Sequence, residues 1–270
     1  MKLLYRLVLM ADLHCGSVLG ITDPKYFRDE YIGFQKPFYE WFCQMATKYP
    51  AQVLICNGDA IEGKGEKSGG LELIETDRNK QVDMAEFLIR KFQPKYVHFI
   101  RGTPYHVGRN ENWEDVLANR FGVKAYDEEF IENVFGDEIL TMHCKHHIGS
   151  SKIPYGKQTS IGRDSIWNFL KAFAGIQPLA QWTIRSHVHY CVENMVVWGN
   201  KEYRCLITPC LQLPGTKYGI QRCSGTVDVG IVVFEFFDNG TYLWHVEYFP
   251  IQQIEKTAVR STAESHLITI

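Results

Sequence analysis

Aspartate and histidine side chains recur along the sequence in a pattern that could bind metal. Five of them follow apolar segments, singly or as pairs separated by one residue: Asp12, His14, Asp59, His187 and His189. Carboxylate oxygens and imidazole nitrogens are ligands for Zn²⁺, Mn²⁺ and iron, whereas a structural zinc site typically uses cysteine. These residue types therefore indicate a transition-metal site of the catalytic rather than the structural kind.

The segments that precede these residues have the length and composition of β-strands. They are residues 3–10, 53–56, 96–100, 139–143 and 182–184. The candidate ligands follow the carboxyl ends of these strands, where an open α/β sheet has its binding sites. We therefore expect side chains far apart in the sequence to converge at one edge of a sheet.

Helical patterns lie between the strands, and hairpin patterns follow them. Apolar residues recur at helical spacing in residues 31–45, 82–92 and 110–121. After residue 190, strands alternate with turns at Gly199-Asn200 and Asp238-Asn239-Gly240. The chain is thus predicted to have an α/β fold, with a mostly parallel sheet followed by antiparallel strands.

Spacing within the histidine-bearing segments suggests how they could approach a metal. Asp12-x-His14 and His187-x-His189 would each place both side chains on one side of an extended segment. His146 and His147 are neighbours that would face opposite ways, so we expect only one of them to bind metal. Spacing does not decide which. His143 lies inside a strand pattern and is more typical of a strand residue than of a ligand.

At these residues the sequence resembles the calcineurin-like metallophosphoesterases, whose motifs run D-x-H, G-D, G-N-H, a histidine and G-H-x-H. The corresponding residues here are Asp12-Leu13-His14, Gly58-Asp59, Gly102-Thr103-Pro104-Tyr105-His106, a histidine within 143–147, and Ser186-His187-Val188-His189. The motifs keep the family's order over roughly residues 5–190, which is more specific than any single motif. The phrases RGTPYHVG and KHHIGSS look most like phage-type or prophage-type members.

The resemblance implies a fold and a domain. The fold would be an α/β four-layer α-β-β-α sandwich, with a parallel or mixed sheet followed by an antiparallel C-terminal sheet. The length of 270 residues suits one metallophosphoesterase domain, 1–270, in which 251–270 form a docked arm or a tail.

The resemblance also implies an activity and its cofactors. Asp12, His14 and His189 would hold one divalent transition metal, and His187 with His146 or His147 a second, bridged by Asp59. The metals would be Mn²⁺, Fe²⁺/³⁺ or Zn²⁺, and a hydroxide held on both would hydrolyse a phosphomonoester or phosphodiester. The resemblance to phage-type members slightly favours nucleotides or nucleic acids as the expected substrates. The alternatives are a protein phosphatase of the same fold and a binding module with a degenerate metal site.

Two positions depart from the family's pattern. Thr103 stands where the family has a metal-binding asparagine, and Pro104 and Tyr105 separate it from His106. We expect His106 to act as a general acid or to replace the missing ligand, and Thr103 to be a weak ligand or a substrate contact. Ser186 replaces a glycine, a change that the turn could absorb.

Residues 62–70, EGKGEKSGG, form an insertion next to Asp59. They lack the order of a phosphate-binding P-loop, so we interpret them as a surface loop. Their position brings Lys64 and Lys67 near the metals, where they could bind substrate phosphate. Trp41, Trp113 and Trp167 lie in amphipathic patterns and are expected in the core rather than as base-stacking platforms.

Composition narrows the location and the partners. The net charge of -2 shows no bulk attraction for nucleic acid, so such a substrate would need a local basic groove. Eight cysteines without a C-x-x-C pair indicate reduced thiols in a cytoplasm. Arg6 interrupts the opening apolar stretch, and no apolar run reaches the roughly 18 residues of a membrane helix. We therefore expect a soluble cytoplasmic protein.

Overall fold

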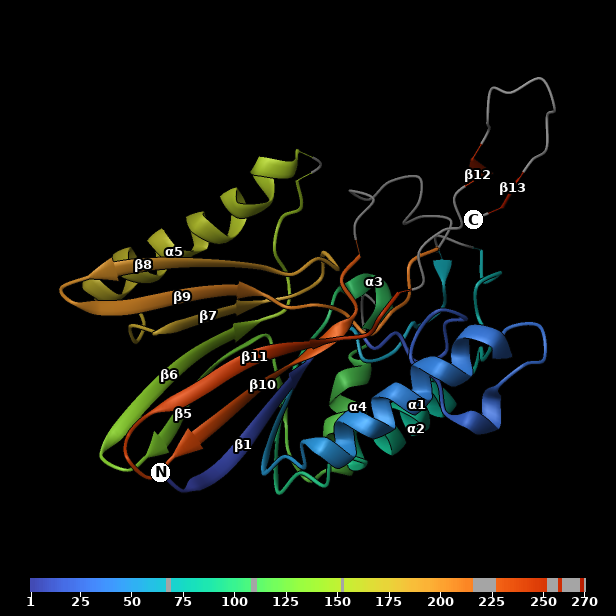
Figure 1. Cartoon of the computed structure of the whole chain (residues 1–270), viewed down its shortest axis with the longest axis horizontal. Coiled ribbons are helices and arrows are strands. Elements are labelled where there is room, and N and C mark those ends of the chain that lie inside the picture. Colours follow the sequence, from blue (N-terminus) through green and yellow to red (C-terminus); the bar gives the residue numbers. More distant parts are fainter. Residues whose placement is uncertain are drawn as a thin grey trace.

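Two stacked β-sheets form the centre of the computed structural model, with helices on both outer faces (Figure 1). The structure describes residues 1–66, 69–107, 111–151, 153–215, 227–251, 257–258 and 268–269. The mixed α/β class is confirmed. All five strands indicated by the apolar segments are present.

The first sheet has the strand order β11-β10-β1-β2-β3-β4. Its strands are β1 (Leu3–Met10), β2 (Val53–Asn57), β3 (Tyr96–Ile100), β4 (Ala125–Tyr126), β10 (Gly230–Phe237) and β11 (Tyr242–Tyr248). Strands β1 to β4 run parallel, and the hairpin of β10 and β11 adds to β1 in antiparallel direction.

The second sheet has the order β5-β6-β7-β9-β8. Its strands are β5 (Glu128–Phe135), β6 (Glu138–Lys145), β7 (Trp182–Arg185), β8 (Val192–Trp198) and β9 (Lys201–Ile207). Both predicted C-terminal hairpins are present, but each extends a different sheet. The reason is that β1 and β7 would otherwise leave unpaired backbone groups at a sheet edge, which a hairpin strand satisfies.

Helices cover the outer faces of the two sheets (Figure 1). The first sheet is covered by α1 (Ile32–Lys48), α2 (Arg78–Arg90) and α4 (Trp113–Arg120), and the second by α5 (Lys157–Phe173). Shorter helical turns are η1 (Pro24–Tyr26), α3 (Pro104–Val107) and η3 (Pro154–Gly156). The first three helices match the predicted ones, and α5 contains the amphipathic pattern expected around Trp167.

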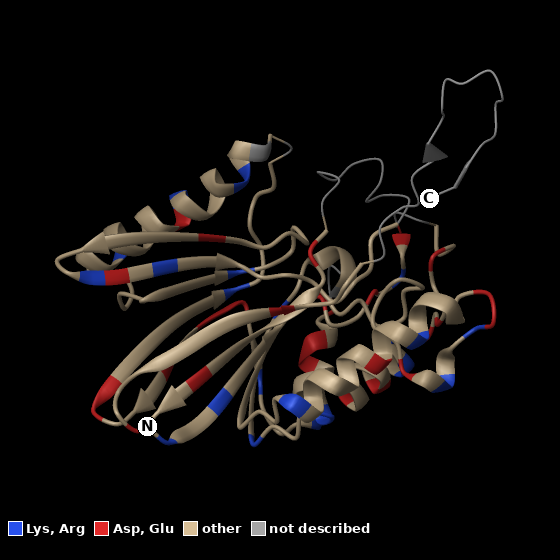
Figure 2. Cartoon of the chain, viewed as in Figure 1, with Lys and Arg blue, Asp and Glu red and all other residues tan. Residues whose placement is uncertain are grey.

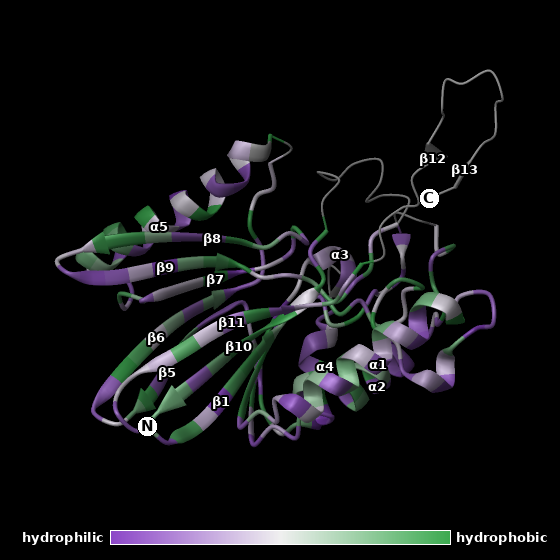
Figure 3. Cartoon of the chain, viewed as in Figure 1, coloured by the Kyte–Doolittle hydropathy of each residue, from purple (hydrophilic) through white to green (hydrophobic). Residues whose placement is uncertain are grey.

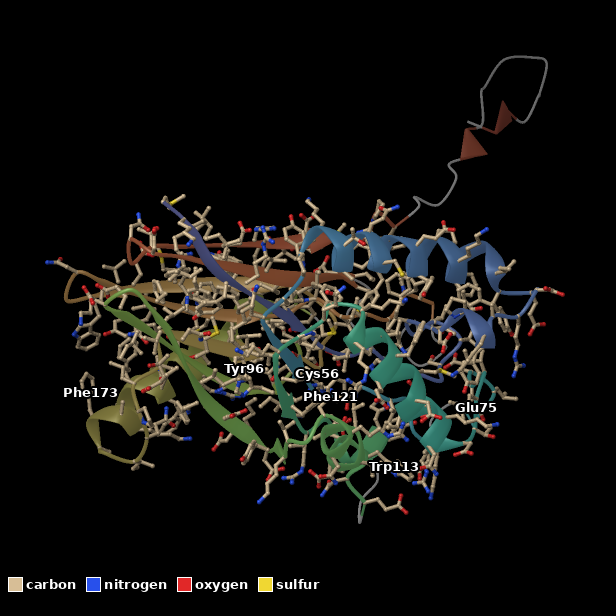
Figure 4. The ribbon with its side chains drawn as sticks, turned by 90° about the horizontal axis from the view of Figure 1, so that it is seen from below. Cys56, Glu75, Tyr96, Trp113, Phe121 and Phe173 are labelled. Carbon is tan, nitrogen blue, oxygen red and sulfur yellow. The ribbon has the colours of Figure 1, made fainter. Side chains whose placement is uncertain are left out.

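Successive side chains of β1 point to opposite faces of the first sheet, and this explains why one face packs on helices and the other on the second sheet. Val8 and Met10 pack with the helices, while Leu7 and Leu9 face the second sheet, and all four are fully buried. Figure 3 shows the green hydrophobic stretches along β1 and β10, and Figure 4 shows Cys56 of β2 inside the packed interior. A third apolar cluster joins α5 to the second sheet. These three apolar layers confirm the four-layer α-β-β-α sandwich.

Two remaining features concern the membrane and the C-terminus. Within the described ranges, the helices are too short or too polar to cross a bilayer.

Strands β12 (Thr257–Ala258) and β13 (Ile268–Thr269) pair antiparallel with each other. The rest of the predicted arm or tail, apart from residue 251, lies outside the described residues.

Candidate metal centre

The carboxyl ends of parallel strands from both sheets meet near α3 (Figure 1). Asp12 follows β1, Asp59 follows β2, His146 follows β6 and His187 follows β7. One oxygen or nitrogen atom from each lies within 4.8 Å of the others, although 175 residues separate Asp12 from His187. The convergence predicted from strand ends is therefore present.

Five of the predicted ligands have a left-handed backbone. Their φ angles are 53° at Asp12, 47° at His14, 50° at Asp59, 75° at His187 and 59° at His189. Among the other described non-glycine residues, only Gln93 and Asn200 have a positive φ. Such a conformation costs on the order of 1–3 kcal/mol for a residue with a side chain, and it clusters at functional sites.

This backbone overturns the expectation that the two pairs lie on extended segments. Strand β1 ends at Met10 and β7 at Arg185, so both pairs lie on loops beyond the strands. Backbone hydrogen bonds hold the first two loops together, because Asp12 N donates to Gly58 O at 2.9 Å and His14 N to Asp59 O at 3.0 Å.

Asp12, His14 and His189 form the first group of potential ligands. Nε2 of His14 lies 3.2 Å from Nε2 of His189, and Oδ1 of Asp12 lies 3.2 Å from the same His189 nitrogen. Two nitrogens about 2.1 Å from a common tetrahedral cation would be about 3.4 Å apart. Oδ1 of Asp12 is buried without a hydrogen-bond partner, so these atoms fit a cation.

Asp12, Asp59, His146 and His187 form the second group. Nε2 of His146 lies 2.9 Å from Oδ2 of Asp59 and 3.8 Å from Oδ1 of Asp12, while Nδ1 of His187 lies 3.9 Å from Oδ2 of Asp59. In this geometry Asp12 is common to both groups, and bridging by Asp59 stays a prediction.

The structure brings His146, rather than His147, into the second group. Nδ1 of His146 donates to the carbonyl of Asn57 at 2.6 Å, which points Nε2 toward the carboxylates. A side chain at Gly58 would overlap the His146 ring, so the position needs glycine. His147 instead stacks on the ring of His187, with 4.9 Å between centroids.

Thr103 contacts the carboxylate of Asp59. Its backbone N–H donates to Oδ1 at 2.7 Å, and its hydroxyl lies 3.2 and 3.3 Å from the two carboxylate oxygens. A Cβ at Gly102 would overlap the same carboxylate. Thr103 therefore orients Asp59 at the position where the resembling family has asparagine.

His106 lies at the site despite the two inserted residues. The inserted Pro104 and Tyr105 form part of α3, which returns the chain so that His106 Nε2 is 4.0 Å from Oδ2 of Asp59. The His106 and His14 rings meet edge to face, 4.5 Å apart. Burial lowers the pKa of His106, and Asp59 opposes this shift.

Glu62 is a site residue that the sequence patterns did not identify. Its Oε2 lies 2.9 Å from His14 Nδ1 and 3.8 Å from His106 Nδ1, and it completes a third group of potential ligands with these histidines. The sequence does show an acidic residue three positions after Asp59. Because this residue begins a glycine-rich segment, the pattern is interpreted as part of a surface loop.

The other predicted residues lie outside these groups or outside the described residues. His143 stacks on Phe130 and contacts Glu128 at 3.2 Å, in agreement with a strand position. Lys64 is exposed on the insertion loop, and Lys67 lies outside the described residues. Their contact with substrate stays a prediction.

The buried carboxylates and imidazoles strongly perturb one another's ionisation. Burial raises the pKa of Asp12, but His189 and His146 overcome this effect and bring the pKa down to about 2. Burial lowers the pKa of His146, but Asp59 and Asp12 raise it to about 9. In the metal-free protein, a proton on His146 thus neutralises part of the carboxylate charge. In the metal-bound protein, the cation would neutralise it instead.

Comparison with known proteins found only distant matches, all of them among solved structures. No family model matches the chain, and no curated protein matches it in sequence. A dimetal phosphatase from Danio rerio has a TM-score of 0.44 and 10% identity, over 88% of this chain and 94% of that chain. A putative 5′-nucleotidase from Staphylococcus aureus has a TM-score of 0.41 and 14% identity, over 95% of this chain and 56% of that chain. GAP50, the anchor in the inner membrane complex of Plasmodium, has a TM-score of 0.39 and 12% identity, over 100% of this chain and 90% of that chain. The chemistry must therefore be inferred from this chain's own side chains.

Proposed function

We propose that this chain is a metal-dependent phosphoesterase that hydrolyses a phosphomonoester or phosphodiester. The observation that carries the proposal is the convergence of buried ligand atoms, some without hydrogen-bond partners, on loops with a left-handed backbone. Six side chains would hold two divalent transition metals: Asp12, His14 and His189 one, and Asp59, His146 and His187 the other. Two such cations would acidify a water molecule and neutralise the oxygens of the attacked phosphoryl group.

The remaining side chains would orient the ligands and the substrate. Thr103 would hold the carboxylate of Asp59, and Asn57 would hold the ring of His146, through the hydrogen bonds described above. The exposed fractions of His187 and His189 are 33% and 22%, whereas Asp12 is fully buried, so substrate would enter on the histidine side. Lys64 and Lys67 would meet its phosphate groups from the insertion loop.

The test combines metal content with hydrolysis of a small substrate. The protein is loaded with Mn²⁺, its metal is counted by elemental analysis, and its turnover of bis(p-nitrophenyl) phosphate and p-nitrophenyl phosphate is measured with and without EDTA. We expect two metals per chain and turnover that EDTA abolishes. Metal-loaded protein with no turnover of either ester would overturn the proposal.

Asp59→Asn supplies the variant for this test. It keeps the size of the side chain and removes the charge, so metal occupancy and turnover should both fall sharply while the variant still unfolds cooperatively in EDTA. The matched control is Asp137→Asn, at an exposed aspartate in the turn between β5 and β6. Full Mn²⁺-dependent activity in Asp59→Asn would contradict its role as a ligand.

A further inference from the structure

A cavity of about 310 Å³ lies between α5 and the second sheet, beside the metal centre. His147 lines it, and the His147 ring stacks on the ring of His187. Nδ1 of His187 lies 3.9 Å from Asp59, so one side chain separates the cavity from the ligand groups. The volume is near the lower end of the about 300–1,000 Å³ of small-molecule sites, and it suits one compact ligand unit.

Five residues of α5 line this cavity, and three of them lie on one face of the helix. Arg163, Trp167 and Lys171 follow one another at intervals of four residues, which places them on successive turns of one face. The expected core position of Trp167 is wrong, because its side chain is 52% exposed. The helix instead buries Ile161 and Phe169 on its other side. An exposed indole therefore lies between two cations.

The charge of the cavity wall is positive. Four lysine or arginine side chains line it, against the two carboxylates of Glu128 and Asp164. Both carboxylates already have partners, because Arg185 contacts Asp164 at 2.7 Å and Lys145 contacts Glu128 at 3.5 Å.

Arg163 and Lys171 are the two cations that remain. Neither has a carboxylate within 4.0 Å in the part of the chain that the structure describes. Figure 2 shows α5 with more blue than red along its length. Their positive charge is therefore available to an anionic ligand that enters the cavity.

The geometry points to a binding site for one nucleotide unit of single-stranded nucleic acid, next to the position that a scissile phosphodiester would take at the metal centre. The base would stack on Trp167, and the flanking phosphates would contact Arg163 and Lys171. This combination of an aromatic platform and cations is how proteins hold single strands without sequence preference. A phosphopeptide would use the cations but leave the indole without a partner. The inference rests on the proposed function for the ester that is cleaved, but the binding itself can be measured separately.

The test measures binding without hydrolysis. Fluorescence anisotropy of a fluorescein-labelled hexathymidylate is followed with the full-length, EDTA-treated protein. We expect Trp167→Ala to raise Kd by about 5- to 160-fold, the range for loss of one stacked base. Trp167→Phe keeps a stacking ring and should recover most of the affinity. Arg163→Gln should reduce the slope of log Kd against log salt by about 0.7, the value for one single-strand phosphate contact.

Matched controls come from side chains outside the cavity. Phe173→Ala removes a ring of α5 that is 66% exposed and points outward at the edge of the molecule in Figure 4. Lys201→Gln removes an exposed charge at the turn between β8 and β9. Neither control should change Kd by more than about twofold, since neither residue lines the cavity.

The outcomes separate this inference from the proposed function. Turnover of bis(p-nitrophenyl) phosphate without hexathymidylate binding would overturn the nucleotide site and leave the phosphoesterase standing. Trp167-dependent binding without turnover of any ester would support the site and overturn the enzyme. Equal Kd values for the wild type and Trp167→Ala would overturn the site, and so would binding of a phosphoserine peptide in preference to the oligonucleotide.

Discussion

Replacing Glu62 by glutamine removes a negative charge that faces the buried ring of His14. Oε2 of Glu62 lies 2.9 Å from His14 Nδ1, and the two side chains are 13% and 2% exposed. Burial raises the pKa of Glu62, but His14 and His106 overcome this and keep it below its ordinary value, so the carboxyl is ionised. Carboxylates behind metal-binding histidines orient the ring and raise the basicity of its other nitrogen.

The magnitude follows from this contact. The two atoms are within ion-pair distance without the geometry of a hydrogen bond, so the effect to expect is the loss of a carboxylate behind a metal-binding histidine. About 1.4 kcal/mol changes an equilibrium constant tenfold. We therefore expect Glu62→Gln to weaken the affinity for the metal at Asp12, His14 and His189 by about 10- to 100-fold, the range that loss of such carboxylates typically produces. Glutamine keeps an oxygen that can still accept from His14, so the effect should fall toward the lower end.

The assay is calorimetric titration of EDTA-treated protein with Mn²⁺, supported by thermal unfolding in EDTA. Glu66→Gln is the matched control, because Glu66 lies on the same loop and is exposed. Wild-type affinity at both metal positions in Glu62→Gln would refute the reasoning. A lower unfolding midpoint in EDTA, together with unchanged metal affinity, would identify Glu62 as a residue that only supports the fold.

Four further predictions concern the site and its surroundings. His187→Ala and His189→Ala should each empty a different metal position, because the two side chains lie in different ligand groups, and elemental analysis that shows the same loss in both would contradict this. His106→Ala should lower kcat by about 10²–10⁴-fold with two metals retained if His106 is a general acid, or lose one metal if it is a ligand. A wild-type rate with two metals would exclude both roles. Lys64→Ala should raise KM and reduce its salt dependence without changing kcat, and an unchanged KM would place the loop away from substrate. Burial lowers the pKa of His143 from 6.5 to about 4, so the unfolded chain takes up a proton first as the pH falls. The free energy of unfolding should then fall by up to about 3 kcal/mol between pH 6.5 and 4, and urea denaturation should show a smaller loss for His143→Gln.

The strands and most helices could be predicted from the sequence, because local apolar periodicity reflects burial. An apolar run marks β1 within its observed bounds, because its last four residues are buried on both faces of the sheet. Gly199-Asn200 forms the expected turn, with φ angles of 58° and 62° that suit a tight hairpin. The gathering of the ligands could also be predicted. Parallel strands end at a common edge, so residues that follow them must lie close together.

Apolar periodicity did not predict how a helix or hairpin packs, because this depends on the surface or sheet edge that it meets. The amphipathic pattern around Trp167 is compatible with a core position, but α5 packs on the second sheet through Ile161 and Phe169, which leaves the indole exposed. Likewise, the hairpin patterns did not show that one pair of strands would extend each sheet, because strand pairing depends on which edges remain open.

The sequence by itself determined which residue types stand at strand ends, and hence where potential metal ligands would gather. Only the tertiary structure decided which atoms face it. The carbonyl of Asn57, from another strand, turns the ring of His146 inward and so separates it from His147. Glu62 reaches His14 across 48 residues, and the ligand loops take left-handed angles that an extended pattern excludes. These features depend on contacts between distant segments, which local spacing cannot encode.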